Sequence, residues 1–317
     1  MPQLFNNNYN CFNTYINPTV PDERPNILAW LSSLDPKLRH QGIRDRRIGD
    51  IGEWVLQTEE FRSWSGGGGE SESDNSFLFC CGDPGVGKTF VRYFNMNELL
   101  RMKEKRQVLT SCDASSVVID NLCNRAGGQN ATVACFYFDF AAQNEQSLVT
   151  ILSSLLKQLV FGLDEIPEEI SKAYEERKNA IGGQGPQISN ILKMLQTISS
   201  RRRSFICIDA LDECATEERA KLLDSLDQLL QQSPGTRIFV TGRPHILPEI
   251  GRHLARGVTS LSISPKRDDI VTYLRSRLAA DTIPDAMDSI LEADILKKIP
   301  SNISEMYVEA TTLRKLP

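Results

Sequence analysis

The chain has 317 residues, of which 40% are hydrophobic and 24% are charged, as is typical of a soluble globular protein. Its net charge of −5 and isoelectric point near 5.4 argue against a protein whose main task is to bind nucleic acid, although they are compatible with a local basic face. The longest apolar stretch, residues 148–163, contains serines, a lysine and a glutamine, so it is too short and too polar to span a bilayer. We therefore expect neither nucleic acid nor a membrane among the partners, and the N-terminus does not resemble a signal peptide.

Cysteine usage indicates a reducing compartment. Four of the eight cysteines lie in apolar, strand-like runs, where cysteine behaves as a small hydrophobic residue: Cys80, Cys81, Cys135 and Cys207. The sequence contains no C-x-x-C pair and only three histidines, so a structural zinc site is disfavoured. We predict a cytoplasmic protein whose cysteines stay reduced.

Three segments precede the first predicted strand. Residues 1–25 are rich in Asn and Pro and are predicted to be a disordered lead-in, whereas residues 65–76 have the composition of a flexible linker. Between them, residues 26–64 carry apolar residues at helical spacing and predict a short helical segment. Its basic stretch either contacts phosphate or an acidic partner, or forms a solvated face beside an aromatic cluster; the arginines concerned are Arg39, Arg44, Arg46 and Arg47.

The next stretch, residues 77–89, predicts a phosphate-binding loop. A short apolar strand runs into Gly82-x-x-x-x-Gly87-Lys88-Thr89, where glycines allow the backbone to wrap around phosphate oxygens and the following helix adds its positive dipole end. In this pattern Lys88 reaches the β- and γ-phosphates and the Thr89 hydroxyl ligates Mg²⁺. The predicted nucleotide-binding residues are Gly82, Asp83, Pro84, Gly85, Val86, Gly87, Lys88 and Thr89.

A polar insertion, residues 93–115, follows this loop. We expect the helix that starts at Thr89 to extend to about Lys105 and then to double back through an exposed loop. The apolar run 117–123 is then left as a separate, less well anchored helix. The insertion and the tail after Met306 both resemble translated intron sequence.

The middle of the chain alternates strands and helices and contains a Walker B-like motif. Residues 133–140 predict a central buried strand and residues 147–161 an amphipathic helix, with two more helices at 167–177 and 187–200. The strand 205–209 ends in acidic residues, and we assign Asp209 to Mg²⁺ through its waters and Asp212 or Glu213 to polarising the attacking water. The alternative is an acidic helix N-cap after a core strand.

The last predicted elements complete the alternation. A helix at 216–231 leads into the strand 237–241, which ends at Arg243, a residue placed either to stabilise γ-phosphate charge or to form a surface salt bridge. A strand at 258–263 and helices at 268–279 and 287–299 follow. Strands that alternate with helices in this way predict an α/β fold with a doubly wound, mostly parallel sheet and flanking helices.

Three motifs together resemble the NACHT NTPases of the STAND signalling class: Gly-Asp-Pro-Gly-Val-Gly-Lys-Thr, Ile-Asp-Ala-Leu-Asp-Glu-Cys and Val-Thr-Gly-Arg-Pro. The chain is most similar to the nephrocystin-3 N-terminal-like module of fungal proteins with ankyrin or WD40 repeats, over roughly residues 27–306. The resemblance implies a P-loop NTPase core at 77–265, a helical extension at 266–306 and an atypical tail at 307–317.

The same resemblance implies the chemistry. Lys88 and Thr89 bind phosphate and Mg²⁺, Asp209 serves the metal, Asp212 and Glu213 serve hydrolysis, and Arg243 senses the γ-phosphate. The implied cofactors are ATP or GTP with Mg²⁺, the implied partner is the nucleoside triphosphate, and self-association through the module is possible. We expect a signalling switch with slow hydrolysis, truncated relative to relatives with effector and repeat domains, or alternatively a nucleotide-binding module without turnover.

Overall fold

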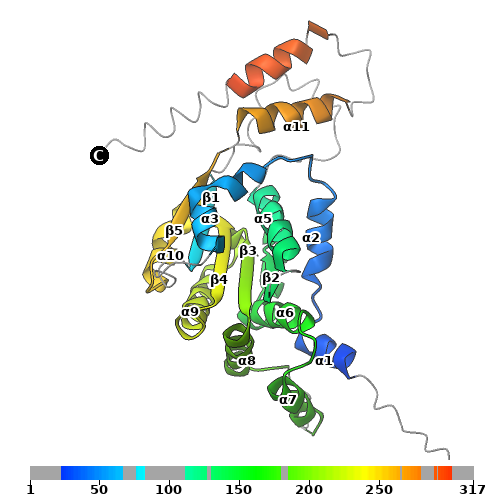
Figure 1. The fold of residues 1–317 in the computed structure, drawn as a ribbon, viewed down its shortest axis with the longest axis vertical. Helices are drawn as coiled ribbons and strands as arrows, with labels where there is room; N and C mark the ends of the chain where they lie inside the picture. The colour runs from blue at the N-terminus through cyan, green and yellow to red at the C-terminus, as the bar shows by residue number, and fades with distance from the viewer. Residues whose placement is uncertain are drawn as a thin grey trace, which may run out of the picture.

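The computed structural model describes residues 23–66, 76–82, 111–126, 130–179, 185–264, 266–279, 289–290 and 292–301. At its centre is a five-stranded sheet in the order β2-β3-β4-β1-β5, and every neighbouring pair is parallel (Figure 1). The strands are β1 (Phe77–Gly82), β2 (Ala131–Tyr137), β3 (Arg203–Asp209), β4 (Thr236–Gly242) and β5 (Thr259–Ile263). The predicted α/β fold with a doubly wound parallel sheet is confirmed.

Helices connect the strands and cover both faces of the sheet. Before β1 lie α1 (Arg24–Leu31), α2 (Pro36–Arg44), the 3₁₀ helix η1 (Glu53–Gln57) and α3 (Glu59–Gly66). The connections after β1 contain α5 (Ser111–Ala126), η3 (Phe140–Glu145), α6 (Leu148–Phe161), α7 (Glu168–Asn179), α8 (Ile188–Arg201), η4 (Leu211–Glu213), α9 (Thr216–Gln232), η5 (Pro244–Ile246) and α10 (Leu247–His253). After β5 come α11 (Arg267–Ala279) and a helical stretch at 292–301.

The hydrophobic core has two halves, one on each face of the sheet. Side chains alternate along a strand, so Phe77 and Phe79 of β1 enter the half covered by α6, α8 and α9. Leu78 and Cys80 enter the half covered by α3 and α5. Because both faces are covered, each central strand is apolar at successive positions, which explains why the strands are recognisable from the sequence.

The N-terminal helical segment contributes to both halves of the core. On one side, the Arg24 guanidinium donates to carbonyl oxygens at the end of α6, including that of Leu163 at 2.6 Å. On the other side, Trp64 of α3 is fully buried and its ring packs against Phe205 and Phe239 at centroid distances of 5.7 and 5.9 Å. The segment is therefore part of the folded body and crosses from one face of the sheet to the other.

Helix α5 corrects the expectation of a weakly anchored helix at 117–123. The helix begins at Ser111, within the stretch expected to be an exposed loop, and contacts β2, β3 and β4. Its buried stripe of Ala114, Val118 and Leu122 has the four-residue spacing of a single helix face, so the serines before the apolar run continue the helix. The part of the insertion at 93–110 lies outside the described residues.

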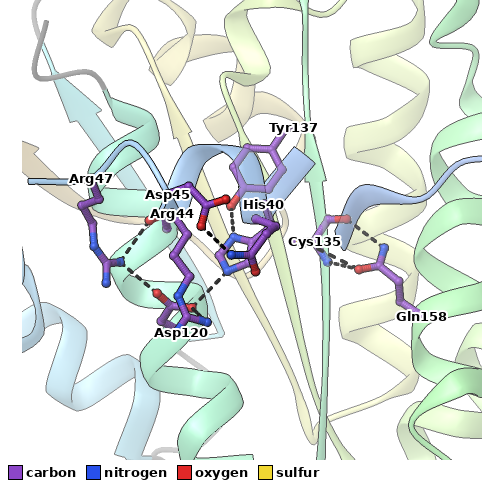
Figure 2. A network of polar contacts seen from close by, with 10 residues as sticks. His40, Arg44, Asp45, Arg47, Asp120, Cys135, Tyr137 and Gln158 are labelled. Carbon is purple, nitrogen blue, oxygen red and sulfur yellow. Dashed lines mark hydrogen bonds and ion pairs between the residues drawn. The ribbon is translucent and has the colours of Figure 1, made fainter. Parts of the chain in front are cut away.

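The outer edge of β2 is covered by the side chain of Gln158 from α6 (Figure 2). Its Oε1 accepts from the Cys135 N–H at 3.0 Å, and its Nε2 donates to the Cys135 carbonyl at 2.8 Å. This glutamine therefore satisfies both backbone groups that Cys135 directs away from β3.

Among the helices of the described residues, none combines the length and the apolar character that a membrane span requires.

Candidate active site at the carboxyl edge of the sheet

The strand order places the carboxyl ends of β1, β3 and β4 side by side. The chain leaves β1 for the far edge strand β2, returns through β3 and β4, and then crosses β1 to form β5. The direction of winding reverses at β1, and ligands of open α/β sheets bind at such a switch point, outside the carboxyl ends of the strands. The edge formed by these strand ends is therefore the candidate site.

The predicted phosphate-binding loop begins at this edge. Gly82 is the last residue of β1, and it lies opposite Ile263 of β5, whose carbonyl oxygen would be 3.4 Å from a Cβ at this position. On the other side, Cys81 lies opposite Gly242 of β4. The remaining predicted nucleotide-binding residues, Asp83, Pro84, Gly85, Val86, Gly87, Lys88 and Thr89, lie outside the described residues.

Asp209 ends β3 at the centre of the edge and is held by two hydroxyl groups. The residue is only 2% exposed. Its Oδ1 accepts from Ser115 Oγ of α5 at 2.5 Å and from Thr241 Oγ1 of β4 at 2.6 Å. The Thr241 hydroxyl also accepts from the Ala210 N–H at 3.0 Å, so it links the ends of β3 and β4. Asp209 is thus a buried carboxylate whose orientation is fixed from both neighbouring elements.

The chain turns sharply after Asp209. Ala210 has φ +54°, a left-handed conformation that is unusual for a residue with a side chain and directs the following residues along the edge. Asp212 then contacts Arg243 twice: Oδ2 lies 3.0 Å from Nε, and Oδ1 accepts from the Arg243 N–H at 3.2 Å. Two predicted catalytic residues are therefore paired with each other, with 46% of the Arg243 side chain still exposed.

Glu213 makes contacts to the connection after β2. Its Oε2 accepts from the Phe140 N–H at 3.1 Å, and its backbone carbonyl accepts from Gln143 Nε2 at 3.0 Å. In this arrangement the glutamate organises the turn that follows β2, beside the candidate site. The structure thus brings Asp209, Asp212, Glu213 and Arg243 to one edge, with Asp209 in the most buried position.

The residues at this edge fit a Mg²⁺ site that is completed by phosphate and water. Mg²⁺ prefers oxygen ligands and is commonly held by one or two carboxylates together with substrate phosphates. Asp209 supplies such a carboxylate, and the hydroxyls of Ser115 and Thr241 hold it in place by donating to its Oδ1. Within the part of the chain that the structure describes, no group of three or more His, Cys, Asp or Glu side chains is placed to hold a metal, at this edge or elsewhere, so a Mg²⁺ here would depend on phosphate and water for most of its ligands.

Sequence reasoning did not identify two residues of this site, Ser115 and Thr241. Thr241 ends the predicted strand 237–241, which is the next strand along the chain after the one that ends at Asp209, and this was the available signal. Ser115 was assigned to the end of the polar insertion 93–115, where an exposed loop was expected. Its only signal is that it directly precedes the apolar run of α5, which turns out to be its own helix.

The basic stretch of the N-terminal segment makes its contacts within the chain (Figure 2). Arg47 Nη1 donates to Asp120 Oδ2 at 2.9 Å and to Ser116 Oγ at 3.1 Å, both on α5. His40 lies between Asp120 Oδ1, at 3.1 Å from Nε2, and the Tyr137 hydroxyl, at 2.6 Å from Nδ1. The acidic partner of Arg47 is therefore Asp120 of the same chain, which lies on the helix that also carries Ser115.

A family model described as "Nephrocystin 3, N-terminal" matches residues 50–243, well over half of the chain. This match confirms the predicted resemblance to a NACHT-type module. No curated protein sequence matches the chain.

Solved structures show only a distant likeness. The Orc1 protein of Aeropyrum pernix, in complex with DNA, is 14% identical with a TM-score of 0.39; the match covers 75% of this chain and 51% of that one. A Walker-type ATPase of Pyrococcus abyssi is 14% identical, with a TM-score of 0.42 and coverage of 82% and 69%. Drosophila ORC bound to DNA is 13% identical, with a TM-score of 0.40 and coverage of 81% and 56%. The chain thus spans about half the length of the Orc1 protein that it matches.

These comparisons correct one expectation. Nucleic acid was not expected among the partners, and this exclusion is contradicted: the Orc1 and ORC structures, to which the chain is distantly similar, are complexes with DNA. The acidic balance of the whole chain was a weak basis for it, since net charge does not report on a local surface.

Proposed function

Because the chain belongs to the nephrocystin 3 N-terminal family, we propose that it is a nucleotide-dependent switch that binds ATP or GTP with Mg²⁺ and hydrolyses it slowly. One observation carries the proposal. The motif Gly82-x-x-x-x-Gly87-Lys88-Thr89 continues from the strand at the switch point, and the buried carboxylate of Asp209 lies at the same edge, one strand beyond β4. A P-loop and a strand-end carboxylate at one sheet edge are the two parts that Mg²⁺-nucleotide binding requires.

Each residue has a defined task in this proposal. Lys88 neutralises charge on the β- and γ-phosphates, and Thr89 and Asp209 hold Mg²⁺. The bound cation offsets the negative charge of the phosphates. Arg243 is exposed enough to turn from Asp212 toward a γ-phosphate, and Glu213 is the candidate for orienting the attacking water.

Nucleotide binding is tested with the variant Lys88→Ala and the control Lys193→Ala, which changes an exposed lysine of α8. Each protein is titrated with fluorescent ATP and GTP analogues in the presence of Mg²⁺. We expect Lys88→Ala to abolish binding and the control to bind as the unmodified chain does. Unchanged affinity in Lys88→Ala would refute the P-loop assignment. Nucleotide that co-purifies with the unmodified chain identifies the preferred base.

A second candidate is a module that binds nucleotide without turnover. The contacts of Asp212 with Arg243 and of Glu213 with Phe140 favour it, because both predicted hydrolytic carboxylates are engaged within the protein. Mg²⁺-dependent phosphate release separates the two. The variant Glu213→Gln keeps an oxygen that accepts from the Phe140 N–H, so its fold is preserved while its charge is lost. Release by the unmodified chain that disappears in Glu213→Gln supports the enzyme, whereas no release from the unmodified chain supports the binding module.

A further inference from the structure

The Ser115 hydroxyl lies at the candidate Mg²⁺ site, although nothing in the sequence motifs assigns it there. It is 1% exposed, and its Oγ lies 2.5 Å from Asp209 Oδ1 and 3.4 Å from Thr241 Oγ1. A buried hydroxyl that donates its single proton to a carboxylate directs oxygen lone pairs toward its other neighbours. A cation beside Asp209 is the kind of group that such an oxygen contacts favourably.

Helix α5 is fixed in place, so the position of Ser115 is defined. On the sheet side, Val118 and Leu122 are buried against the strands. On the outer side, Asp120 binds His40 and Arg47 of the N-terminal segment (Figure 2). Arg47 also donates to Ser116, the residue next to Ser115. The part of α5 that follows Ser115 is thus held from both sides, as a residue of a metal site requires.

Thr241 provides an internal comparison. Its hydroxyl binds the same carboxylate oxygen at nearly the same distance, 2.6 Å. It differs in that its oxygen accepts from the Ala210 N–H, which ties it to the junction of β3 and β4. Thr241 thus belongs to the sheet itself, whereas Ser115 reaches the same carboxylate from α5, a helix that packs on the sheet.

We propose that Ser115 supplies a hydroxyl oxygen to the Mg²⁺ site of this protein. The inference rests on the proposed function, because it assigns a further ligand to the same nucleotide site. It adds to the P-loop threonine a ligand that comes from α5, the helix clamped by the N-terminal segment. A change of the cation at this site is then transmitted directly to the helix that Arg47 and Asp120 hold.

The test measures how much Mg²⁺ is needed for a fluorescent nucleotide analogue to bind the full chain. For Ser115→Ala we expect the half-saturating Mg²⁺ concentration to rise about 10- to 100-fold, as for other residues that support a metal. Ser115→Thr keeps the hydroxyl, so its half-saturating Mg²⁺ concentration is expected to lie much closer to that of the unmodified chain than to that of Ser115→Ala. Far-UV circular dichroism of each variant confirms that the protein is folded.

The decisive variant is Ser115→Cys, which replaces the oxygen with sulfur at almost the same volume. Thiolate ligands favour soft cations, so this variant should need as much Mg²⁺ as Ser115→Ala and regain nucleotide binding with Cd²⁺. The matched control is Thr241→Cys, which places a thiol beside the same Asp209 oxygen and should not be rescued by Cd²⁺. The unmodified chain and Ser115→Ala report the effect of Cd²⁺ on the native cysteines.

Three results overturn the inference. In the first, Ser115→Cys responds to Mg²⁺ as the unmodified chain does. In the second, Cd²⁺ rescues Ser115→Ala or Thr241→Cys as well as Ser115→Cys. In the third, the unmodified chain binds no nucleotide in a Mg²⁺-dependent way, which refutes the proposed function and this inference with it. The first two leave the proposed function intact, so the two failures are distinguishable.

Discussion

Replacing Gln158 with leucine should destabilise the protein strongly, although the two side chains have similar volumes. Gln158 is 9% exposed and provides one acceptor and one donor to the backbone of Cys135 on the outer edge of β2. Leucine leaves both backbone groups without a partner in a buried place, at about 1–3 kcal/mol for each group. Its extra apolar burial offsets about 1–2 kcal/mol. We therefore expect a net loss of about 3 kcal/mol in the free energy of unfolding.

This loss is measurable by urea denaturation followed through tryptophan fluorescence, because the indole of Trp64 is fully buried in the folded protein. For a domain of this size, the loss corresponds to a melting temperature lower by about 6–12 °C. The control is Gln231→Leu, which removes an exposed glutamine whose amide donates to Asp227 in α9 and should change stability by less than about 0.5 kcal/mol. The reasoning is refuted if Gln158→Leu is as stable as this control. Hydrogen exchange at the Cys135 amide, faster in the variant, localises the effect.

Three further predictions concern the packing of the flanking helices. Arg24→Ala removes the donors to the carbonyl oxygens at the carboxyl end of α6 and should lower the free energy of unfolding by about 2 kcal/mol in thermal or urea unfolding. Arg24→Lys should recover part of this loss, and equal stability of the unmodified chain and both variants would contradict the prediction. Arg219 Nη2 lies 2.8 Å from Glu249 Oε2, so Glu249→Ala leaves a buried guanidinium without its carboxylate. This variant should lose about 3–5 kcal/mol of unfolding free energy in the same assay, and a loss below about 1 kcal/mol would contradict the prediction. Burial raises the pKa of Asp269 above 3.8, so the folded protein holds this proton to higher pH than the unfolded chain, and the group's contribution to stability is lost as pH rises through the raised pKa. Asp269→Asn keeps an acceptor for the Trp54 indole and should remove this fall in stability with rising pH, measured by urea unfolding at a series of pH values. Parallel stability–pH profiles of the variant and the unmodified chain would refute the prediction.

The sequence predicted the strands well because the sheet is covered on both faces. Leu78 and Phe79 point to opposite sides and are both buried, so the apolar run is continuous and easily recognised. The order of the strands in the sheet could not be predicted from the sequence. β1 pairs with β4 and β5, which come after β2 and β3 along the chain. The role of Ser115 could not be predicted either. A serine in a polar stretch indicates a loop, and the contact with Asp209 that shows Ser115 to be buried is visible only in the structure.

The candidate site was predicted in part for a related reason. Strand ends can be located from the sequence, so Asp209 and Arg243 were assigned to one edge of the sheet. The orientation of a side chain after a strand depends on local backbone conformation, here the left-handed Ala210, which has no distinctive sequence signal. That turn decides that Asp212 contacts Arg243 and that Glu213 contacts Phe140.

The position of β1 in the sheet also has a consequence for how the protein is made. Phe77 pairs with Ile238 and Leu78 with Thr259, so both neighbours of β1 are synthesised long after it. At about 5–20 residues per second, the nascent β1 waits on the order of ten seconds for its first partner. Meanwhile β2 and β3, which follow each other along the chain, are free to pair first. An apolar strand that stays unpaired on the ribosome for this time is exposed to chaperones, and the candidate site is completed only when translation has passed β4.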